Sequence, residues 1–314
     1  MPLLAWSSAA YGIALPAGHR FPIEKYALLR ERVLALGLVA PEHLGDPPRA
    51  TREELLRAHT SEYVDAFDAG ALDTAAMRRI GFPWSPSLVE RAHRAVGGTI
   101  AAARAAIEYG VAVNLAGGTH HAFPGHGEGF CVFNDVAVAV RALQHERLAD
   151  RAVIIDLDVH QGNGTHAIFA GDRSVYAFSM HGERNYPFTR VAGDLDIGLP
   201  DGLGDDEYLA RLAAALPRVL ADARPAVAFY LAGADAHEGD RLGRLALTFD
   251  GLARRDAMVL EACRDVGIPV AITVAGGYGR DIADTVRVHE NTVRIARDFA
   301  ALREPGRTPA HLPA

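Results

Sequence analysis

Residues 152–166, with the sequence AVIIDLDVHQGNGTH, constrain this chain more than any other stretch. The first four are apolar and mostly β-branched, which is typical of a strand buried on both faces of a sheet. Period-2 alternation along an extended chain would place Asp156, Asp158 and His160 on the same side. The glycines that follow permit a tight turn, and a helix is expected to begin at Thr165.

Two carboxylates and an imidazole at the end of a core strand need compensation. Desolvating an unpaired carboxylate costs several kcal/mol, on the order of the stability of a whole domain. A divalent cation is the simplest compensation, and the alternative is a strand end whose polar residues cap the next helix or face water. The complete pattern, Asp-x-Asp-x-His followed by Gly-Asn-Gly, favours a metal site.

The composition excludes several classes of protein. Of the 314 residues, 49% are hydrophobic and 23% charged, which is ample material for a core and unlike a disordered chain. The net charge of −7 gives no basic field for nucleic acid or an anionic membrane. Because no linker or repeat divides the chain, one domain is expected over 1–303, and the Pro-rich tail at 304–314 is expected to be disordered.

The compartment can be predicted from cysteine content and hydropathy. Cys131 and Cys263 are too few for a disulfide framework and suit a reducing environment. Neither a charged and apolar leader nor an apolar run of about 18 residues is present. A cytoplasmic protein without a membrane partner is therefore expected.

Apolar runs alternate with helical patterns along most of the chain, which predicts a doubly wound, mostly parallel α/β sheet with helices on both faces. A helix is expected over 22–36, a capping box begins at Thr51, and an Ala-rich helix is expected over 83–110. The expected strands are 111–116, 152–157, 174–178, 226–232 and 269–275, with helices at 133–148, 205–221 and 250–266.

Polar residues gather after the expected strands. In open α/β sheets, sites form beyond the carboxyl ends of the strands, so these residues are expected to meet at one edge. In chain order they are His120 and His121, Asp158 and His160, Ser179 and His181, Asp235 and His237, and the segment from Gly276 to Tyr278.

Asp158, His160 and Asp235 together offer one nitrogen and two oxygen ligands. Such a set leaves a position for water and substrate, as a catalytic zinc site requires. The bound ion would lower the pKa of water and polarise a carbonyl oxygen. Taken alone, Asp235 could cap a helix, and His181 or His237 could be an ordinary core or loop histidine.

His120, His121 and Tyr278 complete a set for metal-assisted hydrolysis of an amide or ester. One histidine can act as general base and later protonate the departing amine. Tyr278 can donate its phenolic hydrogen to the oxyanion of a tetrahedral intermediate. Taken alone, the two histidines could be a surface dipeptide, and Tyr278 could simply bond to backbone. These separate explanations do not account for all the residues together.

These motifs resemble the zinc-dependent histone deacetylase superfamily, in the expected order from about residue 10 to 297. Finer segments resemble class IV deacetylases and their bacterial relatives: HRFP at 19–22, GGTI at 97–100, DDEYL at 205–209 and GDRLGRL at 239–245. The superfamily motifs are GGTHH at 117–121, GFC at 129–131, ND at 134–135, DLDVHQGNG at 156–164, GAD at 233–235 and GGY at 276–278.

The resemblance implies a zinc-dependent lysine deacylase with zinc on the Asp-His-Asp set named above. It further implies that His120 pairs with Asp156 and His121 with Asn163. An aspartate partner stabilises an imidazolium, whereas an asparagine orients the ring without adding charge. On that basis His120 is expected to be cationic and His121 to be the neutral general base, while Tyr278 matches the catalytic tyrosine of the family.

The resemblance also implies a structural potassium ion, held by main-chain and side-chain atoms, and a second, weaker monovalent site. The matching positions are Asp156, Asp158, His160, Ser179 and Met180 for the first site, and Phe169, Asp172 and Val175 for the second.

A narrow acyl-lysine tunnel is implied as well. Gly129 and Phe130 match one wall, Tyr186 stands where the family often has phenylalanine, and Gly277 adjoins the tyrosine. Class IV relatives remove long fatty acyl groups, so either an acetyl or a longer acyl group on lysine is expected as substrate. Glu128 would be an acidic residue near the tunnel mouth.

Four alternatives remain open from the sequence. An acetylpolyamine amidohydrolase shares the site and would use an acidic residue at the mouth, such as Glu128 or Glu183. A binuclear manganese hydrolase of the arginase type needs further aspartates, and a non-catalytic acyl-ligand-binding module would keep the pocket without turnover. Iron(II) suits the same ligands as zinc. The sequence does not indicate the oligomeric state.

Overall fold

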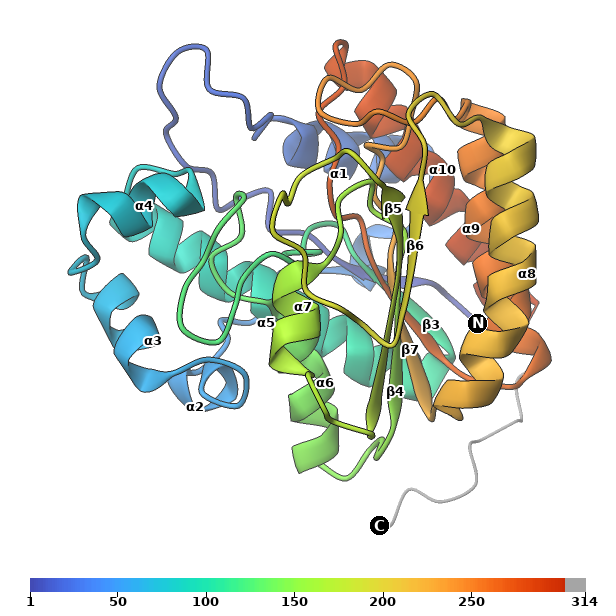
Figure 1. The fold of residues 1–314 in the computed structure, drawn as a ribbon, viewed down its shortest axis with the longest axis horizontal. Coiled ribbons are helices and arrows are strands. Elements are labelled where there is room, and N and C mark those ends of the chain that lie inside the picture. The colour runs from blue at the N-terminus through green and yellow to red at the C-terminus, as the bar shows by residue number, and fades with distance from the viewer. Residues whose placement is uncertain (303–314) are drawn as a thin grey trace.

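A sheet of parallel strands forms the centre of the molecule, in the order β2-β1-β3-β8-β7-β4-β5-β6 (Figure 1). The computed structural model describes residues 1–302, so the tail predicted to be disordered lies outside the described residues. The strands are β1 Leu4–Trp6, β2 Leu44–Gly45, β3 Val111–Asn114, β4 Ala152–Asp156, β5 Val175–Gly182, β6 Leu195–Leu199, β7 Val227–Leu231 and β8 Val270–Thr273.

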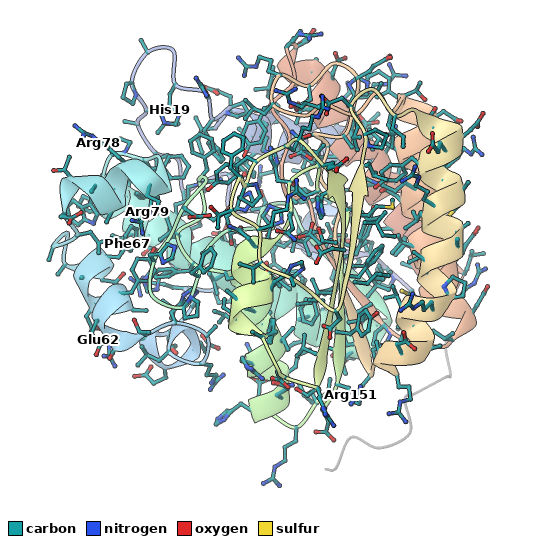
Figure 2. The ribbon with its side chains drawn as sticks, in the orientation of Figure 1. His19, Glu62, Phe67, Arg78, Arg79 and Arg151 are labelled. Atoms are coloured by element: carbon teal, nitrogen blue, oxygen red, sulfur yellow. The ribbon has the colours of Figure 1, made fainter. Side chains whose placement is uncertain are left out.

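Helices cover both faces of the sheet, and side chains fill the spaces between the layers (Figure 2). The predicted doubly wound α/β fold is therefore confirmed. One face carries α1 Lys25–Ala35, α8 Asp205–Ala223, α9 Phe249–Asp265 and α10 Ile282–Ala301; the other carries α2 Arg52–Leu55, α3 Ser61–Asp68, α4 Thr74–Ile80, α5 Pro86–Tyr109, α6 Asp135–His145 and α7 Asn163–Ile168.

The central strand β4 shows why its sequence is apolar throughout. Val153 and Ile155 pack into the core beneath α8 to α10, whereas Ala152 and Ile154 pack into the core beneath α5 and α6. All five residues of the strand are buried. A strand with helices on both sides has no solvent face, so alternation of polar and apolar residues would be destabilising.

Several helix starts follow from capping chemistry. The capping box predicted at Thr51 is present, with Glu54 N–H donating to the threonine hydroxyl and the Glu54 carboxylate accepting from Thr51 N–H. Asn134 caps α6 by accepting from Ala137 N–H at 3.0 Å. Asn134 Nδ2 also donates to the Ala122 carbonyl at 3.2 Å, which joins the start of α6 to the loop that carries the two adjacent histidines.

The structure corrects three local expectations. β4 ends at Asp156, so Asp158 and His160 lie in the following bend and do not share a strand face. Ser179 and His181 lie inside β5, which is longer than expected, and do not follow it. The helix that was expected to begin at Thr165 begins two residues earlier, at Asn163.

Several elements of the structure were not predicted from the sequence. β1 and β2 have three and two residues, too few to show a period. In β6 the burial pattern alternates with exposed residues, as expected for the strand at one end of the sheet order. Helices α3, α4 and α10 were also missed. Among residues 1–302, no helix combines the length and the hydropathy that crossing a bilayer requires.

Candidate active site

Three buried side chains meet beyond the carboxyl ends of β4 and β7. His160 Nδ1 lies 2.9 Å from Asp158 Oδ1 and 3.3 Å from Asp235 Oδ2. One ligand atom of each residue lies within 4.8 Å of the others, as a shared metal ion requires. The bend after β4 supplies two of the ligands, and the segment after β7 supplies the third.

Backbone N–H groups from neighbouring loops orient both carboxylates. Gly276 N–H donates to Asp158 Oδ2 at 2.9 Å, and Val159 N–H donates to Asp235 Oδ1 at 2.9 Å. A Cβ at Gly276 would collide with the carboxylate oxygens of both aspartates. Glycine at 276 thus leaves room beside the ligand oxygens, and the loop after β8 becomes part of the site.

The electrostatics of this trio fit a divalent cation. Asp235 Oδ2 is buried and makes no hydrogen bond within residues 1–302. Burial, together with the charge of Asp158, raises the pKa of Asp235 to about 7. Burial alone would lower the pKa of His160, but its contacts with the two aspartates raise it to about 10. A cation on these atoms would replace the His160 proton and relieve the repulsion between the carboxylates.

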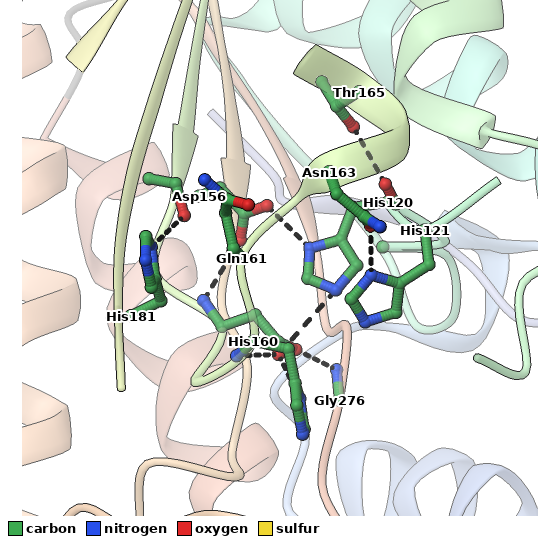
Figure 3. A network of polar contacts seen from close by, with 12 residues as sticks. His120, His121, Asp156, His160, Gln161, Asn163, Thr165, His181 and Gly276 are labelled. Carbon is green, nitrogen blue, oxygen red and sulfur yellow. Dashed lines mark hydrogen bonds and ion pairs between the residues drawn. The ribbon is translucent and has the colours of Figure 1, made fainter. Parts of the chain in front are cut away.

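The rings of the two adjacent histidines lie side by side in the site, and each is bonded to a different partner (Figure 3). His120 Nδ1 lies 2.6 Å from Asp156 Oδ2, and His121 Nδ1 lies 2.7 Å from Asn163 Oδ1. Their ring centroids are 4.1 Å apart. Both side chains are buried, and His120 Nε2 also lies 3.8 Å from Asp158 Oδ1.

Those partners move the two pKa values in opposite directions. Burial opposes protonation of His120, but Asp156 and Asp158 raise its pKa to about 9. Burial and the neighbouring charges on His120 and His160 lower the pKa of His121 well below its usual value. One imidazole is thus suited to carry a charge and the other to accept a proton.

Tyr278 lies on the loop after β8, with its ring 6.4 Å from the His160 ring and nearly perpendicular to it. Asp240 accepts from the Tyr278 N–H at 2.6 Å, and Arg241 Nε donates to the Tyr278 carbonyl at 3.0 Å. Burial, with the charges of Asp158 and Asp235, raises the pKa of the Tyr278 phenol well above its usual value. The phenol therefore keeps its proton and can donate it in a hydrogen bond.

Asp135 organises the loop that carries the histidines. Its carboxylate accepts from the N–H groups of Gly118 and Thr119 and from the hydroxyls of Thr99 and Thr119. A Cβ at Gly117, where φ is +81°, would collide with this carboxylate. The Asn-Asp motif at 134–135 indicated this segment without indicating that the aspartate holds the loop.

The residues predicted to line a tunnel surround the site. A Cβ at Gly129 would meet the rings of His121 and Tyr186, and the Tyr186 ring lies 4.9 Å from that of His121. The Phe130 ring lies 6.0 Å from that of Tyr278. The Gly277 carbonyl accepts from the buried Lys25 ammonium at 3.3 Å.

The positions predicted to bind potassium include two members of the Asp-His-Asp trio, and the other three lie in β4 and β5. Asp156 and Ser179 are partners in the pairing of β4 with β5 and are both buried. The Ser179 hydroxyl also contacts His181 Nδ1 at 2.9 Å. The three positions of the second predicted site lie around the turn between α7 and β5, where Asp172 N–H donates to the Phe169 carbonyl and Val175 N–H donates to the Asp172 carbonyl.

Some residues considered for the site lie outside it. His237 Nδ1 accepts from Gly239 N–H, and its ring packs on Phe249 with centroids 4.3 Å apart. It is a turn histidine, as the alternative interpretation held. Cys131 and Cys263 are free thiols and both are buried.

Comparison with known proteins identifies the family. A family model described as "Histone deacetylase domain" matches residues 19–293. The chain belongs to the histone deacetylase family. It is 49% identical to an uncharacterized protein of Picosynechococcus sp., covering 92% of this chain and 96% of that protein. It is 31% identical to the histone deacetylase-like amidohydrolase of Pseudomonas aeruginosa, covering 92% and 82%.

The structural comparison agrees with the family assignment. The crystal structure of a histone deacetylase homologue from Aquifex aeolicus has a TM-score of 0.83 and 26% identity, covering 97% of this chain and 86% of the other. This family consists of metal-dependent amidohydrolases with a deacetylase fold. The buried Asp-His-Asp trio is the place in the described residues where a metal ion fits.

Proposed function

We propose that this protein removes acyl groups from the side-chain nitrogen of acylated lysine, with a zinc ion on Asp158, His160 and Asp235. The observation that supports the proposal most strongly is the convergence of this buried trio with His121 and Tyr278 at one sheet edge. Residues 1–303 would act as one catalytic domain. A divalent cation bound there would supply Lewis-acid chemistry, lowering the pKa of a water ligand and polarising a carbonyl oxygen.

Three side chains would transfer protons and stabilise charge during the reaction. His121 takes a proton from the attacking water, because its environment keeps the ring neutral. Tyr278 donates its phenolic hydrogen to the oxyanion that forms as water adds to the carbonyl carbon. His120, paired with Asp156, stabilises negative charge as an imidazolium. When the C–N bond breaks, the proton on His121 passes to the departing amine. The acyl group leaves as a carboxylic acid, which then loses its remaining proton to water.

Substrate identity is the next part of the proposal. Glu128 accepts a hydrogen bond from Asn163 Nδ2 at 2.8 Å. Because this carboxylate already has a partner within the protein, it is poorly suited to bind a cationic polyamine. Glu183 is exposed on the segment after β5. A lysine substrate, whose charge is lost on acylation, therefore suits the interior better than an acylated polyamine.

The decisive experiment measures turnover of the zinc-loaded protein on acetyl-lysine peptide, myristoyl-lysine peptide and acetylspermidine. Hydrolysis of an acyl-lysine peptide that disappears on chelation and returns with zinc is expected. Preference for acetylspermidine would favour the polyamine enzyme, and no turnover on any of the three would favour a binding module.

Metal analysis of the purified protein distinguishes one zinc or iron from two manganese per chain. Turnover with and without potassium tests the proposed monovalent sites.

A further inference from the structure

Glu128 contacts the residue that orients the proposed general base. Asn163 Nδ2 donates to Glu128 Oε1 at 2.8 Å, while Asn163 Oδ1 lies 2.7 Å from His121 Nδ1. These are the only side-chain hydrogen bonds of Asn163 among residues 1–302. The Glu128 side chain is 16% exposed, so water has little access to this row of three residues.

The backbone holds Glu128 in this place. The Cys131 N–H donates to the Glu128 carbonyl at 2.9 Å, which closes a tight turn over 128–131. Next to it, Gly129 packs against the rings of His121 and Tyr186. The carboxylate therefore reaches Asn163 from a turn that is itself packed against the catalytic histidine.

Donor and acceptor chemistry makes the row directional. An ionised carboxylate only accepts hydrogen bonds, so the end of Asn163 that faces Glu128 has to be its NH₂ group. The carbonyl oxygen of the same amide then faces His121, and this oxygen also only accepts. His121 Nδ1 must consequently carry a proton, which leaves the Nε2 lone pair free. Only this tautomer of a neutral histidine can take a proton at Nε2.

We propose that Glu128 is a positioning residue that selects the Nε2-basic tautomer of His121 by fixing the orientation of the Asn163 amide. The inference rests on the proposed function, because that function assigns the base role to His121. Without an acceptor-only group at 128, the Asn163 amide has two orientations. The flipped one presents NH₂ to His121 Nδ1, which moves the ring proton to Nε2 and blocks the base.

The first test compares E128Q with E261Q in zinc-loaded protein on the best acyl-lysine peptide. Both substitutions exchange a carboxylate for an amide of the same shape, but Glu261 is exposed on α9. E128Q is expected to lower kcat by roughly 10–100-fold, the usual effect of removing such a partner, with KM within about twofold. E261Q is expected to match the wild type. An unchanged kcat in E128Q would overturn the proposal.

A rescue variant separates orientation from packing. In E128Q/N163D a carboxylate at 163 can accept both from His121 Nδ1–H and from the glutamine amide, so the required tautomer is restored. The double variant is expected to recover at least about tenfold of the kcat that E128Q loses. If E128Q merely disturbed packing, N163D would add a second defect, and a further loss of kcat would contradict the proposal.

A spectroscopic measurement keeps this inference distinct from the proposed function. In zinc-loaded protein labelled with ¹⁵N-histidine, His121 is assigned by its absence in H121Q. The wild type is expected to show a protonated Nδ1 and a bare Nε2, and E128Q a shift toward the opposite tautomer. An unchanged tautomer in E128Q overturns the inference even in an active enzyme. A changed tautomer in a protein without acyl-lysine turnover would reject the proposed function alone.

Discussion

His120 and His121 are neighbours in sequence, and yet their surroundings favour opposite charge states. His120 bonds to a buried carboxylate, which raises its pKa to about 9. The partner of His121 is an amide, which adds no charge to offset burial, so the pKa of His121 is lowered. A protein that needs one imidazolium and one free base can obtain both from a His-His dipeptide by pairing them differently.

The clearest residue-scale prediction concerns Tyr278. Tyr278→Phe keeps the ring packed beside His160 and Phe130 but removes the proposed hydrogen-bond donor to the oxyanion. Turnover is expected to fall by roughly 10²–10³-fold, the scale of losing one oxyanion donor, with little change in melting temperature. Tyr109→Phe is the matched control, because Tyr109 ends α5 just before β3, at the opposite edge of the sheet. Near wild-type turnover in Tyr278→Phe would remove the tyrosine from the mechanism.

The sequence was informative at this scale wherever one short motif contains the chemistry. The spacing of Asp158 and His160, and the pair at 120 and 121, could be read directly from the sequence. The pairs of His120 with Asp156 and of His121 with Asn163 were implied by the family resemblance. Other contacts between distant loops could not be predicted, because no local pattern encodes them. Asp240 bonds to the Tyr278 N–H across 38 positions, and Glu128 bonds to Asn163 across 35.

At the scale of elements, the strands buried on both faces were predicted and the marginal ones were missed. β4, β7 and β8 are short, mostly apolar runs that are buried throughout, and their sequences therefore show the pattern of a strand covered on both faces. β1 and β2 exist only because they pair beside β3, a tertiary effect invisible in two or three residues. Likewise, the bend after β4 is set by the contacts of its aspartates, which local propensity does not contain.

His59 links the segment between α2 and α3 to the Phe123 loop and to the start of α6, and it makes the fold sensitive to acid. It lies between α2 and α3, where its Nδ1–H donates to the Phe123 carbonyl and its Nε2 accepts from Asn134 N–H, both at 2.9 Å. Only a neutral ring can do both. Burial lowers the pKa of His59 to about 4. Its stabilising effect is therefore complete above pH 6.5 and declines as the pH falls from 6.5 to 4, because only the unfolded chain takes up the proton.

His59→Gln removes this titration and provides the test. Between pH 7 and pH 4 the wild type is expected to lose up to about 3 kcal/mol more unfolding free energy than the variant, measured by urea denaturation at each pH. His145→Gln, which changes an exposed histidine at the end of α6, should follow the wild type. Parallel pH curves for the wild type and His59→Gln would show that His59 titrates alike in the folded and unfolded chain.

At the scale of the whole molecule, the parallel sheet brings distant segments to one edge. The order of the strands places β4 between β7 and β5, with β8 next to β7. The loops after β4, β7 and β8 therefore supply the aspartates, the histidine and the tyrosine, although these residues span 158 to 278 in the chain. This convergence was predictable from the α/β alternation, because all parallel strands end at the same edge.

The same architecture predicts that metal binding stabilises the entire fold. The three ligands come from two segments of the sheet edge, so an ion that binds them binds the folded chain and not the unfolded one. Zinc at about 100 times its Kd adds about 2.7 kcal/mol, which corresponds to a rise in melting temperature of roughly 5 °C for a chain of this size. Zinc is expected to raise the melting temperature of chelated wild type by that amount and to leave Asp235→Asn nearly unchanged, since that variant lacks the ligand oxygen that is buried without a partner. Equal shifts in the two proteins, measured by calorimetry, would mean that zinc binds elsewhere and that the Asp-His-Asp trio is not the metal centre.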